Sequence, residues 1–324
     1  MIERNYSIDI LKFICATLIV FLHTDFQWHN AVLPLTRCAV PCFLMISGFL
    51  LYTDGRGIGR ERLKRNIKHI LHIIIWSTVL FAVIKEIIAI THGELFIPSK
   101  RQWLKFIIFN DNPFGFHLWY LGAYLYVLIM MMVVDKYKLW SRMLWCIPFL
   151  LFGDLLFGKY SILLLNKEFP YICVRNFLFV GIPYFLLGVW LKINITKLQT
   201  INRHIYLCGI ILFSTTSIME KMLLLYLDKS PAREHYLSTT FLAICLFLFI
   251  ISFKNVKASN VSRMGERDSL YIYVFHPLFL FTLPTLIKNL PTVIGEVYFW
   301  IAPLLILVLT ITLTAFLRKT KIIK

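Results

Sequence analysis

Residues 8–23 read IDILKFICATLIVFLH, an apolar run that is interrupted by Asp9 and Lys12 and ends in a histidine. A helix of about twenty apolar residues crosses a hydrocarbon core of ~30 Å, so this run predicts a first membrane span over 8–28. A histidine at membrane depth is costly unless it faces a polar cavity or a partner. Because imidazole transfers protons near neutral pH, His23 is a candidate functional residue. The alternative is an interfacial histidine that only caps the helix.

Similar runs recur along the whole chain, in which 59% of the 324 residues are hydrophobic and 16% are charged. Soluble domains carry about a quarter charged residues. The length criterion gives ten candidate spans: 8–28, 35–52, 67–91, 116–135, 139–157, 171–191, 205–227, 236–253, 270–287 and 297–317. The sequence therefore predicts an all-α polytopic membrane protein, a bundle of about ten transmembrane helices that forms one domain over residues 1–324.

The formal charge of +17 indicates topology rather than a nucleic-acid partner. With the N-terminus inside, Lys and Arg concentrate on one side, and this bias sets orientation. The basic segments are Arg4, 56–68, 136–142, 192–203, 254–267 and 318–324. We therefore expect both termini to be cytoplasmic and the basic side to face anionic headgroups. No small-x-small cleavage site follows the first span, so we do not expect a cleavable signal.

The loop 54–66 reads DGRGIGRERLKRN and holds the densest cluster of cations. Arg62 and Arg65 are three residues apart and share one face of a helical start, with Arg60 just before them. Arginine forks match phosphate oxygens, and glycines let a backbone approach a ligand closely. The loop therefore predicts a site for a nucleotide-type ligand on the cytoplasmic side. The alternative is a basic loop that only fixes topology.

The second span begins at Arg37 and contains Pro41 and Ser47-Gly48. A proline inside a span frees a backbone carbonyl, and small residues permit close packing. The pattern indicates either an irregular helix beside a cavity or an ordinary kinked, tightly packed helix. Residues 175–188 also place an Arg before a Pro-x-Phe-Leu run that ends in Gly, which suggests similar packing roles.

On the opposite side, residues 117–121 read HLWYL and open the fourth span. Trp119 is typical of the interfacial belt, whereas His117 adds a titratable group that could meet His23. Residues 100–104 predict an interfacial amphipathic segment before a turn at 111–113. His276 precedes a proline that should end or kink the ninth span. The seven cysteines lack metal-ligand spacing, and no metal site is expected.

The motifs described above, taken in their order along the chain, resemble those of the acyltransferase-3 family of integral membrane acyltransferases. The matching residues are SIDILKF (7–13) with His23, Arg37 with Val40-Pro41-x-Phe43 and Ser47-Gly48, Arg62-x-x-Arg65, HLWYL (117–121), and SLYIY (269–273) before His276. The family has Arg where this chain has Lys12, and that change weakens bidentate binding.

The resemblance implies a ten-helix bundle that takes an acyl group from cytoplasmic acyl-CoA and passes it to a hydroxyl of a glycan or lipid-linked sugar. The chain looks most like the compact members that O-acetylate surface polysaccharide, in a bacterial cytoplasmic (inner) membrane. Acetyl-CoA would then be a donor substrate rather than a permanently bound cofactor. The partners would be acyl-CoA, the glycan acceptor and membrane lipids, with no nucleic acid.

The resemblance also implies roles for single residues. By the resemblance His23 is the catalytic histidine, and the chemistry of the residues adds Arg37, His117 and Trp119 as further catalytic candidates. On that chemistry His23 is a general base or an acyl carrier, and Arg37 or the Trp119 indole is an oxyanion donor. The donor-binding candidates are Asp9, Lys12, Arg60, Arg62 and Arg65. Asp9, Lys12 and Arg37 would line the path between the two faces, and Arg62 and Arg65 would bind the CoA phosphates.

Two other classes stay open on the residues alone. A transporter or flippase of a small polar or glycan-linked substrate also has polar residues within its spans, and Pro41 and Pro183 could mark discontinuous helices. A transporter function would leave Arg62, Arg65 and His23 without specific roles. A sensory or enzyme-anchoring membrane domain is the third class.

Overall fold

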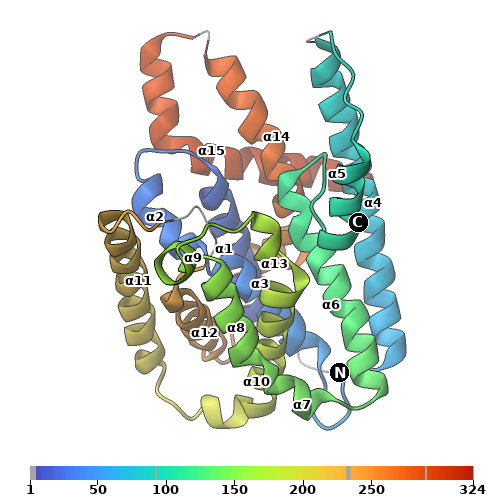
Figure 1. Cartoon of the computed structure of the whole chain (residues 1–324), viewed down its shortest axis with the longest axis vertical. Helices are drawn as coiled ribbons and strands as arrows, with labels where there is room; N and C mark the ends of the chain where they lie inside the picture. Colours follow the sequence, from blue (N-terminus) through green and yellow to red (C-terminus); the bar gives the residue numbers. More distant parts are fainter. Residues whose placement is uncertain (1–4, 92, 231–234, 289, 324) are drawn as a thin grey trace. The chain divides into compact units, whose positions relative to one another are not determined.

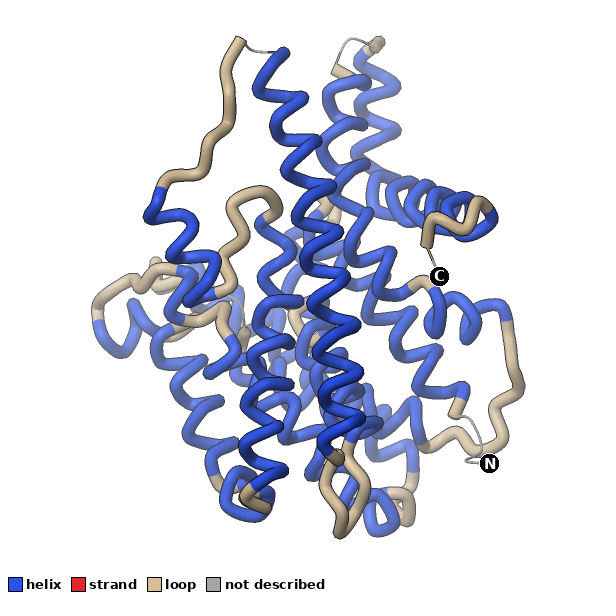
Figure 2. Tube along the Cα trace, turned by 90° about the vertical axis from the view of Figure 1, so that its right-hand side faces the viewer, coloured by secondary structure: helices blue, strands red, loops and turns tan. Residues whose placement is uncertain are grey.

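The computed structural model describes residues 5–91, 93–230, 235–288 and 290–323. Within these ranges every regular element is a helix, and the single β-feature is an isolated bridge between Thr53 and Gly57 (Figure 2). The prediction of an all-α protein is confirmed. Arg4, one of the residues used to predict the topology, lies outside the described residues.

Nine helical segments in the described ranges are long and apolar enough to cross a membrane. They correspond to nine of the ten predicted spans. The tenth, predicted over 236–253, is the 15-residue apolar helix α12 (Leu237–Ile251), which is only about 22 Å long at ~1.5 Å per residue. The chain is therefore a multi-pass membrane protein, as the hydropathy pattern predicted.

Two boundaries differ from the prediction in ways that concern the site. Helix α1 (Tyr6–His23) ends five residues before the expected boundary at 28, where the backbone of Thr24 becomes extended (φ −99°, ψ 126°). The Thr24 hydroxyl and N–H both donate to the Val20 carbonyl, at 2.7 and 3.1 Å. Helix α4 (Arg60–Thr91) begins seven residues before the expected boundary at 67. Arg60, Arg62 and Arg65 therefore lie on a helix rather than in a loop.

The chain folds as two compact units, each described by itself. Unit 1 comprises Met1–Phe43, Lys197–Leu227 and His235–Lys324, and unit 2 comprises Leu44–Thr196 and Asp228–Glu234. Helices α3 (Ala39–Leu51) and α10 (Ile182–Leu198) run across the boundaries between the units. The single domain expected from the sequence stays a prediction.

Unit 1 is built around α1. Its other helices are α2 (His29–Thr36), α11 (Arg203–Tyr226), α12, α13 (Asn260–Arg267), α14 (Ser269–Ile287) and α15 (Thr292–Lys319). Helix α1 packs against α13 and α14, and α14 packs against α15 (Figure 1). The contact with α13 requires Gly265, since a Cβ there would lie 1.7 Å from the Asp9 carbonyl oxygen. Ala16, Ile272 and Ile306 lie in the apolar core between these helices.

Three basic segments of unit 1 lie at one end of it. The Arg318 guanidinium pairs with Asp268 and donates to the Arg267 carbonyl at 2.9 Å. The Arg203 guanidinium lies 5.3 Å from the centre of the Phe253 ring, and the Phe253 carbonyl accepts from the Ser7 hydroxyl at 3.1 Å. The charge pattern had assigned these segments to one side of the membrane, and the contacts agree with that grouping.

Unit 2 contains the remaining elements. They are α4, α5 (Lys100–Phe109), η1 (Phe116–Leu118), α6 (Trp119–Lys136), α7 (Trp140–Leu144), α8 (Cys146–Phe157), α9 (Ser161–Leu165), η2 (Tyr171–Cys173) and the π-helix η3 (Phe177–Gly181). Helices α4 and α6 run side by side (Figure 1). Helix α5 confirms the helical segment predicted at 100–104, and Ser99 and Gln102 form its N-terminal capping box.

Helices α3 and α10 pack directly against each other in unit 2, at the glycines that end the two Pro-x-Phe-Leu runs. A Cβ on Gly48 would lie 2.0 Å from the Phe185 carbonyl oxygen, and one on Gly188 would lie 2.0 Å from that of Met45. Each pattern thus provides the small residue that admits the other's backbone, as in other tightly packed membrane helices. The similarity between the two segments reflects a shared packing role.

Candidate active site

The His23 and His276 rings stack in unit 1, with centroids 5.5 Å apart and planes inclined by 19°. His23 is the last residue of α1 and is half-buried, whereas His276 in α14 is fully buried. Two imidazole rings at this distance are in contact, so each ring affects the polarity around the other. The two residues are 253 positions apart in the sequence. We therefore take this histidine pair as the centre of the candidate site.

The Pro277 that follows His276 sets the orientation of its ring. Helix α14 continues through this proline to Ile287, which matches the ninth span predicted over 270–287 and excludes a helix end at Pro277. Proline has no N–H to donate to the carbonyl four residues earlier, here that of Tyr273. The His276 Nδ1 lies 2.8 Å from this oxygen and 3.2 Å from the Ile272 carbonyl. Since carbonyls only accept, Nδ1 carries the ring proton and Nε2 carries the lone pair.

Asp9 and Lys12 lie at the other end of α1. The Lys12 Nζ and Asp9 Oδ1 are 3.0 Å apart, and the Asp9 side chain is 7% exposed. Fourteen residues separate Asp9 from His23 within one helix, which corresponds to about 21 Å at ~1.5 Å per residue. The pair therefore cannot touch a small group that is bound at His23, whereas a long, narrow donor could contact both ends.

Arg37 lies in the two-residue break between α2 and α3 and is half-buried. Its charge acts on the Tyr236 hydroxyl and on the Lys221 ammonium. Pro41 is in the first turn of α3, where its missing N–H would have no intrahelical partner. The irregularity expected in this span is the two-residue break at Arg37 and Cys38.

The arginines at the start of α4 have different environments in unit 2. The Arg62 guanidinium donates to the Leu51 and Leu50 carbonyls at 2.9 and 2.8 Å, so it caps the C-terminal end of α3. Arg60 and Arg65 are exposed. A guanidinium has five N–H donors, so Arg62 keeps three for other partners. The pair predicted to bind phosphate thus consists of one arginine that is fixed by the fold and one that faces outward.

Asp135, at the end of α6, organises the glycine-rich turn before α4. Its carboxylate accepts from the Ile58 and Gly59 N–H groups at 2.9 and 3.1 Å and from the Trp140 indole at 3.2 Å. A Cβ on Gly57 would lie 2.1 Å from Asp135 Oδ1, and Gly57 has a left-handed φ of 78°. The expected close approach of a glycine therefore involves Asp135 rather than a ligand.

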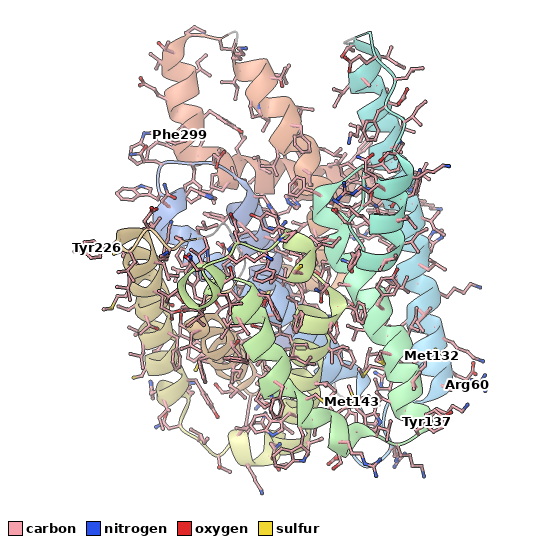
Figure 3. The ribbon with its side chains drawn as sticks, viewed as in Figure 1. Arg60, Met132, Tyr137, Met143, Tyr226 and Phe299 are labelled. Carbon is pink, nitrogen blue, oxygen red and sulfur yellow. The ribbon has the colours of Figure 1, made fainter. Side chains whose placement is uncertain are left out.

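Two cavities open at this end of α4 and α6, near the labelled residues Arg60, Met132 and Tyr137 (Figure 3). The smaller, about 350 Å³, is lined by Arg60 and Lys136 among others. The larger, about 510 Å³, is lined by Tyr52, Arg56 and Lys138 among others. Burial, then the charges of Asp54 and Asp135, raise the pKa of the Tyr52 phenol above its usual value. The larger cavity combines cations with the aromatic rings of Tyr52 and Trp140, a combination that suits a nucleotide-type ligand.

His117 and Trp119 lie at the opposite end of α6. The buried His117 ring packs edge-on against Phe81, with centroids 4.7 Å apart. The Trp119 carbonyl accepts from the Asn110 side-chain amide at 2.9 Å, and the Arg175 guanidinium lies 6.0 Å from the Trp119 ring centre. His117 and His23 belong to different units, so their predicted meeting stays a prediction.

The predicted residues therefore form separate groups. Unit 1 holds Asp9, Lys12, His23 and Arg37, and unit 2 holds Arg60, Arg62, Arg65, His117 and Trp119. His276 belongs to the motif that follows SLYIY, but nothing in the sequence indicated that its ring lies beside that of His23, so it was not among the predicted site residues. Over the described ranges no group of three or more His, Cys, Asp or Glu side chains could hold a metal ion, and the seven cysteines are free thiols.

The fold and the histidine pair define a class, a multi-pass helical membrane protein with a candidate proton-transfer site at the end of a span. Residues 5–319 match the family model described as an acyltransferase domain. The chain belongs to the acyltransferase-3 family and is a membrane acyltransferase. No curated protein and no solved structure matches it significantly.

Proposed function

We propose that the protein is a membrane O-acetyltransferase that moves an acetyl group from cytoplasmic acetyl-CoA to a hydroxyl of a cell-surface glycan or lipid-linked sugar. The observation that carries the proposal is the stack of His23 on His276 in a chain of this family. A neutral imidazole at the end of a span can deprotonate a hydroxyl, and acyl transfer to a hydroxyl requires that step.

His23 is the proposed general base. It removes the acceptor proton as the hydroxyl oxygen attacks the thioester carbonyl, the C–O bond forms and the C–S bond breaks. The CoA thiolate then takes the proton from His23, so that His23 returns to its neutral form. Arg37 or the Trp119 indole is the proposed donor to the oxyanion. In a second route His23 itself carries the acetyl group, and ping-pong kinetics identify that route.

The donor is proposed to bind at the basic end of unit 2. CoA carries phosphates and cannot cross a bilayer, so its nucleotide must dock from the cytoplasm. The exposed cations Arg60 and Arg65 are suited to phosphate contacts, together with the free N–H groups of Arg62. Asp9 and Lys12 are proposed to contact the donor further along its path. This assignment requires both termini to be cytoplasmic, in a bacterial inner membrane.

Purified protein in detergent or nanodiscs tests the function directly. We expect it to bind acetyl-CoA and to transfer radiolabelled acetyl to surface polysaccharide taken from cells that lack the gene. We also expect one O-acetyl ester to be missing from the glycans of those cells. Protein that neither binds nor cleaves acetyl-CoA, but takes up solute in vesicles, would be a transporter.

A further inference from the structure

Unit 2 contains a cavity of about 690 Å³, and of the candidate residues above Trp119 alone lines it. It lies between α5, the start of α6 and the segment around η2. Phe116, Trp119 and Tyr171 contribute aromatic rings to its wall. Cavities of about 300–1,000 Å³ that combine aromatic walls with a few polar groups are typical sites for small organic ligands. The cavity thus has the size and lining of a binding site.

The charged groups of this cavity balance one another. Lys105 and Arg175 contribute two positive charges, and Asp111 and Glu168 contribute two negative charges. The Arg175 guanidinium lies 4.4 Å from the centre of the Tyr171 ring, a cation–π contact that holds both side chains in the wall. A ligand with a full charge would gain little from such a lining, because no net opposite charge offsets its desolvation.

The cavity is also remote from the proposed donor end. Trp119 is the first residue of α6, and Asp135, which lines both cavities at the donor end, lies sixteen residues later. Within one helix this separation is about 24 Å, close to the thickness of a hydrocarbon core of ~30 Å. One face of unit 2 thus presents the cationic start of α4, and the other presents a neutral, aromatic cavity.

We propose that this cavity binds an uncharged pyranose unit of the acceptor glycan. The inference rests on the proposed function and assigns the acceptor to named residues. The apolar C–H face of a sugar ring packs on Tyr171 and Trp119, and its hydroxyls donate to the carboxylates of Asp111 and Glu168. Lys105 and Arg175 donate to hydroxyl or ring oxygens. A uronic acid brings a carboxylate whose desolvation this balanced lining does not offset.

The test is sugar binding, which does not depend on acetyl transfer. Full-length protein in detergent is titrated with methyl glucoside and methyl galactoside and with the matched methyl glucuronide and galacturonide, and binding is followed by saturation-transfer NMR. We expect the neutral glycosides to bind at least tenfold more tightly than the uronides. Tyr171→Ala and Arg175→Ala should each weaken neutral-sugar binding at least tenfold, because each removes half of the stacked pair.

Matched controls lie at the other end of α6. Tyr137→Ala and Arg142→Ala remove the same residue types from exposed positions outside the cavity, and both should bind sugar like the parent. Equal sugar affinity in the cavity variants and the parent, preference for the uronides, or no sugar binding by the parent would each overturn the inference. Acetyl-CoA affinity is measured in parallel. A parent protein that binds sugar but not acetyl-CoA would count against the proposed function and not against the sugar site.

Discussion

The Tyr273 carbonyl, which Pro277 leaves without its usual backbone donor, lies 2.8 Å from the His276 Nδ1. One proline thereby fixes the tautomer of a buried histidine and directs its lone pair to Nε2. The same ring stacks on His23, 5.5 Å away. A local backbone constraint in α14 thus determines the chemical environment of the candidate base in α1. We propose that His276 acts as a positioning residue for His23.

The first prediction concerns this hydrogen bond. His276→Phe keeps an aromatic ring beside His23 but leaves the Tyr273 carbonyl buried without a donor, which costs about 1–3 kcal/mol. Adding Pro277→Ala restores a backbone N–H four residues after Tyr273 and should recover most of the lost stability. Thermal unfolding of the parent, both single variants and the double variant measures this coupling. If the stability changes of His276→Phe and Pro277→Ala simply add in the double variant, the two residues act independently and the proposed coupling is wrong.

A second prediction separates a steric requirement from a conformational one in the turn before α4. Gly57→Ala should destabilise the turn and weaken acetyl-CoA binding, because its Cβ would lie 2.1 Å from Asp135 Oδ1. Gly55→Ala is the matched control, since Gly55 also has a positive φ, of 71°, but no atom within 4 Å of its Cβ. It should cost only about 1–2 kcal/mol. Limited proteolysis of the turn and acetyl-CoA titration measure both effects, and indistinguishable variants would refute the role given to Asp135.

The third prediction distinguishes Arg65 from Arg62. Arg65→Ala should weaken acetyl-CoA binding without loss of thermal stability, since a phosphate contact contributes about 1.5–3 kcal/mol and the side chain is exposed. Arg62→Ala should lower stability as well, because the Leu50 and Leu51 carbonyls lose their donor. Both affinity losses should shrink as salt rises.

Lys64→Ala is the control for these arginines, since Lys64 is an exposed cation on the same turn that pairs with Glu61 at 2.9 Å. Its acetyl-CoA affinity should stay within about twofold of the parent's, because an exposed ion pair contributes only ~0–1 kcal/mol. Parental acetyl-CoA affinity at low salt in the Arg62→Ala, Arg65→Ala double variant would reduce the two arginines to topology signals.

Much of the fold could be predicted, because the bilayer forces long apolar helices and a basic side on the sequence. The predicted spans therefore match the observed helices closely, and the basic segments of each unit gather at one end. The pairing of α1 with α13 could not be predicted, because it depends on contacts such as Gly265 against the Asp9 carbonyl. Nor could the cap formed by Arg62, since its carbonyl partners belong to another helix.

A fourth prediction concerns which side of the membrane the basic end of unit 2 faces. In a variant without the seven native cysteines, Arg56→Cys should resist an impermeant maleimide in intact cells and react after permeabilisation. Ile97→Cys, at a position that is 81% exposed between α4 and α5, should react in intact cells. Both outcomes follow from the Lys/Arg bias. The opposite pair of results would reverse the orientation and remove the basic end of unit 2 from the cytoplasm.

The last prediction concerns His23 itself. His23→Ala should lower acetyl transfer by roughly 10²–10⁴, the usual contribution of acid–base catalysis, while acetyl-CoA affinity stays nearly unchanged, because the base acts in the transition state. In the parent, turnover should rise with pH through a single ionisation, since only the neutral ring accepts the proton. His29→Ala is the control, because His29 is a half-buried histidine of the same unit that packs on Phe26. The His29→Ala protein should keep parental turnover.

If His23 is only an interfacial cap, the His23→Ala protein will instead lose thermal stability and keep acetyl-transfer activity in the surviving protein. A well-folded His23→Ala protein with near-parental turnover would remove His23 as the base and make His117 the next candidate.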